Sequence, residues 1–377
     1  MNYLIYFFFL SLSFGQLERI SFLDQSVNIY FHDIIILSII IFYAVKNILT
    51  RKVDVREKLD SIEKAGVIFL VILFLSLING FWRFTFLQNI VGFLYFGRLC
   101  MYFIFYFILT HWIHYHNKQS QNAIRMGMIL FVVSTVVFSY IQFFLYPNLR
   151  NLSYLGWDPH YYRVFGLFFD TSTAGIVYVM LFFWLISQKH SYKSLVVIGS
   201  ISLFGLILFT YSRSIYITFG IVFTLFFIKR ISPLKMLLLV CVFILMVFIM
   251  PRPNGYGGEL MRTYSITTRM NDYKEGLKLW LRKPLLGYGY NRLRSFTKRP
   301  DNISHAGASF SSSYMTILAS SGLIGLLVFL YLLYLFFRNA GFNGKLLIFI
   351  VAFSSLFDNI FLNNFILTIF LMLMTII

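Results

Sequence analysis

Apolar runs of about twenty residues recur along this chain from end to end. Charged residues make up only 12% of the 377 residues, which is too few to cover a soluble domain of this size. In lipid the backbone must satisfy its own hydrogen bonds, so only helices and closed barrels span a membrane. The runs are continuous rather than alternating, which excludes a barrel. The pattern therefore predicts an all-α, polytopic transmembrane bundle.

We expect about twelve helices, with boundaries good to a few residues. They are the runs near 3–17, 29–47, 65–82, 90–113, 126–146, 171–188, 194–210, 212–228, 234–250, 312–337, 344–358 and 360–376. The first run, the seventh and eighth, and the last two are short or weakly separated, so ten or eleven spans also fit the pattern. The first run lacks the basic region and cleavage site of a signal peptide, and we predict that it is retained.

No internal repeat is visible, so we predict one membrane domain with a large inserted loop. Its parts are helices one to nine in residues 1–250, the loop in 251–311 and helices ten to twelve in 312–377. The two cysteines, Cys100 and Cys241, lie inside apolar runs and form neither a disulfide framework nor a metal pattern. The chain has no phosphate-binding GxxxxGK[ST], no DxD-like pair in an outer loop and no GxSxG, and we predict no metal and no cofactor.

The loops between the runs alternate in their content of Lys and Arg. One set of loops holds about fifteen such residues, whereas the opposite short loops hold about four: Arg19, Arg83, Arg150 and Arg163. Loops rich in Lys and Arg stay in the cytoplasm. We therefore predict that both termini are cytoplasmic and that the long loop is extracytoplasmic. A net charge of +18 could indicate nucleic acid, but topology explains most of these charges, and we predict no nucleic-acid partner.

The long loop, residues 251–311, carries eleven Lys and Arg residues against four acidic residues. Long loops cross a membrane whatever their charge, so these cations do not contradict an outer location. A strongly basic loop on a polytopic membrane protein indicates a site for an anionic substrate at the bilayer surface.

Two candidate clusters precede the loop. In the first, Arg163 is followed by Gly166-Leu-Phe-Phe-Asp170, and Asp170 is a natural helix cap. This is either a capped helix after a tight loop, or an anion site formed by Arg163 and the helix N-terminus. In the second, Thr210-Tyr211-Ser212-Arg213, the arginine lies between two apolar runs. It is either an anchor at a short outer turn or, as we favour, a cation that faces a phosphate.

Two more clusters lie in and after the long loop. Residues 268–283 have apolar residues at helical spacing, and Pro284 should end this amphipathic helix in the outer interface. Arg269 at its first turn is either a solvated charge or a functional one. Near the end of the loop stands His305, its single histidine, and histidine is the usual general base near neutral pH. A lone loop histidine is more often a bystander.

Other polar residues in or beside the runs have simpler explanations. His111, His114 and His116 stand near the end of a run, where a polar cluster is a more economical explanation than a metal site. Arg98 lies within a run, and we predict that it lines the bundle interior.

Taken in order, these clusters resemble the bacterial O-antigen polymerase and O-antigen ligase superfamily. The matching elements are Gly166-Leu-Phe-Phe-Asp170, Thr210-Tyr211-Ser212-Arg213, Arg269…Trp280…Pro284…Gly287-x-Gly289, and His305 with Tyr314…Gly322-x-x-Gly325. Their order and spacing fit over about the last 220 residues, whereas the N-terminal half matches only in hydropathy. The chain departs from the family near His305, because Ser311, Ser312 and Ser313 stand where members often carry an Asn.

The resemblance implies a GT-C-like glycosyltransferase in the bacterial inner membrane. Its substrate would be an oligosaccharide on undecaprenyl diphosphate, with membrane lipid around it and a flippase and chain-length regulator as pathway partners. We expect Arg213 and Arg269 to stabilise the diphosphate leaving group and His305 to act as the base in an inverting, metal-independent transfer. The surrounding motif residues are expected to bind substrate: Arg163, Asp170, Tyr211, Ser212, Trp280 and Tyr314.

Three functions remain open at this point. We prefer a polymerase, in which another lipid-linked repeat unit is the acceptor. The first alternative is a ligase that transfers the glycan to lipid A-core or another acceptor. The second, from a different class, is a flippase, but such a transporter should place charges along a central cavity and show repeated halves.

Overall fold

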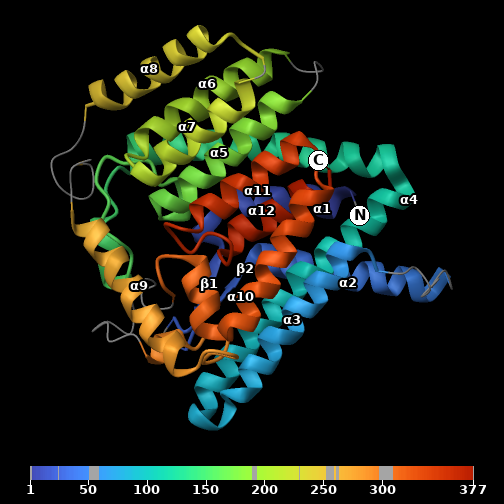
Figure 1. The fold of residues 1–377 in the computed structure, drawn as a ribbon. Helices are drawn as coiled ribbons and strands as arrows, with labels where there is room; N and C mark the ends of the chain where they lie inside the picture. Colours follow the sequence, from blue (N-terminus) through green and yellow to red (C-terminus); the bar gives the residue numbers. More distant parts are fainter. Residues whose placement is uncertain are drawn as a thin grey trace.

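The computed structural model describes residues 2–23, 25–50, 59–188, 193–228, 230–251, 259, 263–296 and 309–376, without the side chains of residues 50, 115–117 and 264. Within these residues the fold is almost entirely helical (Figure 1). The helices are α1 Asn2–Ser13, α2 Phe31–Thr50, α3 Ser61–Asn79, α4 Phe86–Leu145, α5 Thr171–Ser187, α6 Lys193–Phe209, α7 Arg213–Phe227, α8 Pro233–Ile249, α9 Tyr264–Arg282, α10 Ser313–Asn339, α11 Phe342–Ser354 and α12 Asn364–Met374.

Every predicted apolar run coincides with a helix, and the amphipathic segment forms α9. The predicted runs 90–113 and 126–146 are parts of one helix, α4, which is 60 residues long. By length and composition, five stretches of the described chain can cross a membrane: Phe31–Leu49, Ser61–Arg83, Phe86–His114, Lys118–Leu145 and Ser313–Asn339. The other apolar helices have 10–17 residues. The length and composition of these helices are therefore those of a multi-pass membrane protein.

A short β-hairpin stands between α1 and α2, where the all-α prediction has no strand. Strands β1 Arg19–Phe22 and β2 Val27–Tyr30 pair antiparallel, with Arg19 opposite Tyr30. The connecting turn has left-handed backbone at Leu23 and Gln25. Because Tyr30 belongs to β2, α2 begins at Phe31 rather than at the predicted residue 29.

Helix α5 forms the centre of the bundle, and nearly all of its residues are buried. It packs against α6, α7, α11 and α12. Helix α8 lies at the edge of the molecule beyond α6 and α7, and most of its apolar side chains are exposed (Figure 1). In Figure 1, helix α9 lies along the opposite side of the molecule from the two chain ends.

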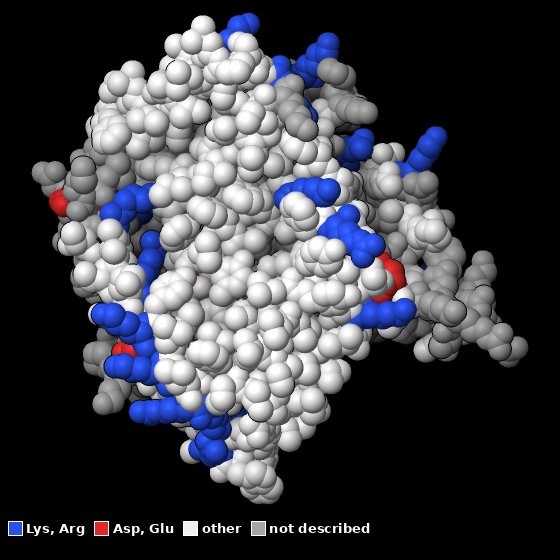
Figure 2. All heavy atoms as spheres, viewed as in Figure 1, with Lys and Arg blue, Asp and Glu red and all other residues white. Residues whose placement is uncertain are grey.

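The charged residues occupy two opposite sides of the molecule. Figure 2 shows Lys and Arg gathered at the lower left, over α9 and the neighbouring helix ends, and again at the upper right. A broad band with almost no charge separates them on this face. An uncharged band between two basic rims is the surface expected of a protein that sits across a bilayer.

Two glycine positions lock the segment after α9 against α10. Gly287 and Gly322 both have left-handed backbone, with φ of +62° and +71°. A Cβ on Gly287 would lie 2.4 Å from the carbonyl carbon of Ser320, and one on Gly322 would lie 2.1 Å from the carbonyl oxygen of Leu285. The backbones approach so closely that only glycine fits. This contact, across a break in α10 at Gly322, fixes the end of α9 on the bundle.

Candidate functional site

The Thr210–Arg213 segment forms a tight turn that aims Arg213 away from the bundle core. Helix α6 ends at Phe209, Tyr211 has a left-handed φ of +48°, and α7 begins at Arg213. The Tyr211 hydroxyl donates to the carbonyl of Pro251 at 2.6 Å, and Ser212 Oγ lies 3.2 Å from Ser214 Oγ. The turn is thus held at both ends, and it places Arg213 at the first position of its helix.

The buried side chain of Arg163 stabilises this turn by hydrogen bonds. Its side chain is 3% exposed. Its Nε donates to the carbonyl oxygen of Thr210 at 3.0 Å, and its Nη2 donates to the same oxygen at 2.9 Å and to that of Tyr211 at 3.3 Å. Nη2 also donates to Thr171 Oγ1 at 3.0 Å, which ties the turn to the start of α5. The guanidinium therefore binds backbone carbonyls, and it joins the two sequence clusters that precede the long loop.

Arg213 of α7 reaches the face of α9 that carries Arg269. Nη2 of Arg213 donates to Ser265 Oγ at 2.5 Å. Ser265 and Arg269 are four residues apart on α9, so their side chains lie on the same helix face. The two arginines are close enough for their charges to interact. Two cations held together in this way form a local positive field suited to a multiply charged anion.

Asp358 pairs with Arg269 across the site. Nη2 of Arg269 lies 3.3 Å from Oδ2 of Asp358, which stands between α11 and α12. The Asp358 side chain is 33% exposed. Desolvation by the surrounding protein raises the pKa of Asp358 to about 6, opposed by the charge of Arg269 and by a hydrogen bond from Ser172. Solvent thus still reaches a carboxylate whose pKa the fold raises.

The segment that carries Asp358 is anchored on three sides. Ser312 Oγ donates to the carbonyl of Ser355 at 3.0 Å, and Tyr273 of α9 donates its hydroxyl hydrogen to the carbonyl of Leu356 at 2.5 Å. Asn363 Nδ2 donates to Thr173 Oγ1 at 3.2 Å. These contacts join the starts of α5, α10 and α12 to α9, so four elements converge around the Arg269–Asp358 pair.

Asp170 caps α5, as the capped-helix interpretation of its cluster expected. Its Oδ2 accepts hydrogen bonds from the backbone N–H and the hydroxyl of Thr173, both at 2.7 Å. Its negative charge also acts on Asp358. Asp170 therefore lies near the convergence point but uses its carboxylate to cap the helix N-terminus.

Trp280 and Tyr314 bind backbone carbonyls close to the site. Trp280 Nε1 donates to the carbonyl of Pro284 at 3.1 Å, which closes the end of α9 where the proline was expected to end it. The Tyr314 hydroxyl donates to the carbonyl of Ala352 at 2.9 Å and joins α10 to α11. These two side chains therefore hold helices in place around the arginine pair.

The predicted base, His305, lies outside the described residues. The described chain returns at residue 309 beside α9. There the backbone N–H of Ser311 donates to Asp272 of α9 at 2.9 Å. The end of the long loop is thus tied to the helix that carries Arg269.

An apolar groove of about 470 Å³ runs between α7 and α8. It begins on α7 at Tyr216 and Ile217, one turn after Arg213, and continues to Leu225. On α8 it is lined from Val240 to Phe248. An apolar groove therefore starts one helical turn from Arg213, which places an apolar surface next to this cation.

Sequence reasoning missed Asp358. The residue lies at the edge of two predicted apolar runs, 344–358 and 360–376, and a carboxylate in such surroundings is itself a signal of function. Within the described residues, no group of three or more His, Cys, Asp or Glu is arranged to hold a metal ion.

A comparison with protein families matches the part of the chain that includes these residues. Residues 196–330 match the family model described as O-antigen ligase. The match begins within α6 and ends within α10, so it includes the Arg213 turn, α9 and the start of α10. It confirms the resemblance seen in the sequence motifs. No curated protein matches the chain.

Proposed function

We propose that this chain, a member of the O-antigen polymerase and ligase superfamily, polymerises a surface polysaccharide. In the proposed reaction a glycan moves from undecaprenyl diphosphate onto the sugar of another lipid-linked repeat unit. The acceptor hydroxyl oxygen attacks the anomeric carbon, the glycosidic C–O bond to the diphosphate breaks, and the diphosphate leaves with the electron pair. The configuration at the anomeric carbon inverts.

The single observation that carries this proposal is the contact of Arg213 with Ser265, which brings Arg213 to the face of α9 that carries Arg269. As the C–O bond breaks, negative charge develops on the leaving diphosphate, and fixed cations stabilise that charge in the transition state. Guanidinium groups match pairs of phosphate oxygens. Arg213 is held by Ser265 and Arg269 by Asp358, so both cations are oriented before substrate binds.

Other described residues position these two arginines. Asp358 accepts a hydrogen bond from Nη2 of Arg269, and the other N–H groups of this guanidinium would bind phosphate oxygens. Arg163 acts through the backbone of Thr210 and Tyr211, which fixes the direction in which Arg213 leaves the turn. We therefore assign Asp358 and Arg163 as positioning residues.

The proton of the acceptor hydroxyl needs a base. We retain His305 for this role, because an imidazole with an ordinary pKa of about 6.5 accepts a proton near neutral pH. Residue 309, where the described chain resumes, lies close to α9 through the Ser311–Asp272 contact.

The groove between α7 and α8 suits the isoprenoid chain of the substrate. A polyprenyl tail needs an apolar surface that is continuous with the diphosphate site, and this groove begins one helical turn from Arg213. Helix α8 lies at the edge of the molecule (Figure 1), and we propose that the groove opens to the lipid there. The substrate would then enter laterally from the bilayer.

The proposed cellular setting follows from this substrate. The protein would lie in the bacterial inner membrane with both termini in the cytoplasm and α9 on the periplasmic side. A flippase of the same pathway would deliver the substrate, and a chain-length regulator would act with the polymerase.

The description of the matching family favours a second function, that of a ligase. A ligase would use the same arginine pair but transfer the glycan to lipid A-core or another acceptor. The arginine pair serves either reaction, because both break the same bond to the diphosphate.

Surface polysaccharide in a deletion strain distinguishes the two functions. A polymerase deletion should leave single repeat units on the acceptor, whereas a ligase deletion should leave full-length polymer on undecaprenyl diphosphate. Complementation by Arg213→Gln or Arg269→Gln should fail, and complementation by the exposed control Arg83→Gln should succeed at equal expression. Normal chains from the Arg213 and Arg269 variants would refute the proposed site.

A further inference from the structure

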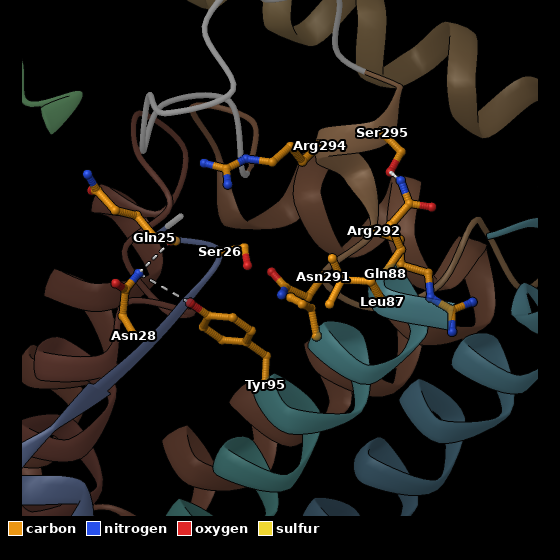
Figure 3. Close-up of a pocket in the computed structure, with 11 residues that line it drawn as sticks. Gln25, Ser26, Asn28, Leu87, Gln88, Tyr95, Asn291, Arg292, Arg294 and Ser295 are labelled. Carbon is orange, nitrogen blue, oxygen red and sulfur yellow. Dashed lines mark hydrogen bonds between the residues drawn. The ribbon is translucent and has the colours of Figure 1, made fainter. Parts of the chain in front are cut away.

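A second cavity, of about 300 Å³, is lined by elements other than α9. Its walls are the β1–β2 hairpin at Gln25, Ser26 and Asn28, the first three turns of α4 and the segment 291–295 (Figure 3). Neither member of the arginine pair is among the described residues that line it. The N-terminal part of the chain, where no family motif was found, thus contributes most of the residues that line this cavity.

The cavity wall is rich in groups that both donate and accept hydrogen bonds. Figure 3 shows Tyr95 on one wall, with Ser26 and Asn291 beside it and Gln88 opposite. Ser26 Oγ is buried and has no hydrogen-bond partner among the described residues. Sugar hydroxyls need donors and acceptors together, whereas a phosphate group needs donors alone. The mixture of amide, hydroxyl and phenol groups therefore fits a sugar ring.

Two residues that line the cavity have strained backbone conformations. Gln25 and Asn291 have left-handed φ angles of +63° and +55° without being glycine. Such conformations persist where the surrounding structure enforces them, often at functional sites.

The charged residues among the described residues that line the cavity, Arg292 and Arg294, are both cations. Arg294 extends over its mouth in Figure 3. Burial lowers the pKa of Arg294, which shows that its guanidinium has lost part of its hydration. A partly desolvated cation binds an anion more strongly than a hydrated one. None of the described residues that line the cavity is a carboxylate.

The Arg292 guanidinium packs behind the cavity wall rather than pointing into the cavity. Its guanidinium lies 4.7 Å over the Phe84 ring, and its Nη2 donates to Asn89 Oδ1 at 2.5 Å. In Figure 3 this guanidinium turns away from Tyr95. Arg292 therefore ties the 291–295 segment to the start of α4 and adds positive charge behind the wall.

A buried ion pair between Arg98 and Asp33 stabilises the wall formed by Tyr95 and the hairpin. The Arg98 guanidinium lies 4.9 Å over the Tyr95 ring and donates to the carbonyl of Asn28. Its Nε lies 3.1 Å from Asp33 Oδ2. Arg98, the charge predicted to line the bundle interior, thus fixes the hairpin and Tyr95 in place, so the cavity is formed before ligand binds.

We infer that this cavity binds one acidic sugar residue, such as a uronic acid, of the glycan that the protein handles. The inference rests on the proposed function and names the class of its substrate. Polar groups around Tyr95 would bind the sugar hydroxyls, and Arg294 would bind the carboxylate. The volume is at the lower end of the range for small-molecule sites, about 300–1,000 Å³, which suits one sugar ring rather than a lipid chain.

Direct binding to the full-length protein in detergent tests this inference. The probes are tetrasaccharides of galacturonic acid and of glucuronic acid, with maltotetraose as the neutral control. Wild type should bind at least one acidic probe at least about tenfold more tightly than maltotetraose, which is the low end for a hydrogen bond to a charged group. Arg294→Gln should lose that difference, and Val91→Trp, which fills the cavity from α4, should weaken binding of the acidic probe.

Three controls separate this site from the proposed diphosphate site. Arg83→Gln removes an exposed arginine nearby and should leave binding unchanged. Arg294→Lys keeps the charge and should retain part of the preference. Arg213→Gln should keep acidic-sugar binding even though it slows transfer, so failure of the catalytic proposal and failure of this one are distinguishable. Equal binding of acidic and neutral probes, no measurable binding of either, or an unchanged preference in Arg294→Gln would overturn the inference.

Discussion

Arg269 of α9 and Asp358 of the α11–α12 connection lie 3.3 Å apart, Nη2 to Oδ2, and so join two segments separated by 89 positions in the chain. The pair forms where the starts of α5, α10 and α12 converge on α9. In the proposed reaction, Arg269 stabilises the negative charge of the leaving diphosphate, and Asp358 orients the Arg269 guanidinium.

Asp358→Asn should lower the transfer rate about ten- to a hundredfold, because a charged hydrogen bond that orients Arg269 is worth about 1.5–3 kcal/mol. In wild type, protonation of Asp358 breaks the pair as the pH falls through about 6, so activity should decline below that pH. In Asp358→Asn the decline that remains should be that of the base alone. The pH dependence of kcat/KM in both proteins measures this, and superimposable profiles would contradict the positioning role.

Arg269→Gln should lower kcat by about 100- to 1,000-fold, the effect of removing one fixed donor from a developing negative charge. The charge of Arg269 lowers the pKa of Asp358, so its removal should also move the Asp358 pKa above 6. Because Asp358 acts on the reaction only through Arg269, the residual activity should keep only the pH dependence of the base, as in Asp358→Asn. A residual activity that retains the full wild-type pH profile would contradict the positioning role of Asp358.

Arg163→Met should reduce both stability and activity, although Arg163 is not proposed to touch substrate. The substitution leaves the carbonyls of Thr210 and Tyr211 without their buried donor, at a cost of about 1–3 kcal/mol. Thermal unfolding in detergent and kcat for the same preparation measure the two effects. Lost activity together with unchanged unfolding and unchanged KM would instead indicate that Arg163 binds the reacting groups.

Gly322→Ala should destabilise the protein by more than about 1 kcal/mol, because alanine at a left-handed position that also meets the Leu285 carbonyl is strained twice. Gly97→Ala is the matched control. Gly97 lies inside α4, and a Cβ added there would meet no atom of the described residues within 4 Å, so alanine should be neutral or stabilising. Thermal unfolding of the two variants side by side provides the measurement, and equal unfolding temperatures would contradict the close packing at Gly322.

Ile221→Trp should raise KM for the polyprenyl-linked substrate, because it narrows the groove between α7 and α8. Leu245→Trp is the control, since this exposed α8 residue is not among the described residues that line the groove. Initial rates at varied substrate concentration separate KM from kcat. Equal KM values for the two variants would place the isoprenoid chain elsewhere.

The helices were predictable from the sequence because apolar runs in a membrane protein leave the backbone no alternative. The continuity of α4 was not, because the polar residues 114–125 resembled a loop. That stretch contains neither Gly nor Pro, so nothing in it ends the helix. The β1–β2 hairpin was also missed, since it is too short to show an alternating pattern before α2 begins.

The site was predictable only in part. The motif order pointed to Arg213 and Arg269, but their meeting through Ser265 depends on how α9 docks, which no spacing in the sequence encodes. The same holds for Asp358, whose partner lies in a different part of the chain. Arg163 was predicted to hold an anion, yet its contacts with the Thr210 and Tyr211 carbonyls depend on the fold around the turn.

A transfer assay with the purified protein, and an undecaprenyl-diphosphate-linked repeat unit as the single glycan substrate, tests the proposed function at its centre. We predict that wild type and Arg83→Gln extend the repeat unit into longer lipid-linked chains and release undecaprenyl diphosphate, and that Arg213→Gln and Arg269→Gln do both about 100- to 1,000-fold more slowly. Extension by the two arginine variants at the wild-type rate would contradict the proposed diphosphate site. Failure of wild type to extend a substrate of the organism's own glycan would contradict the polymerase function itself.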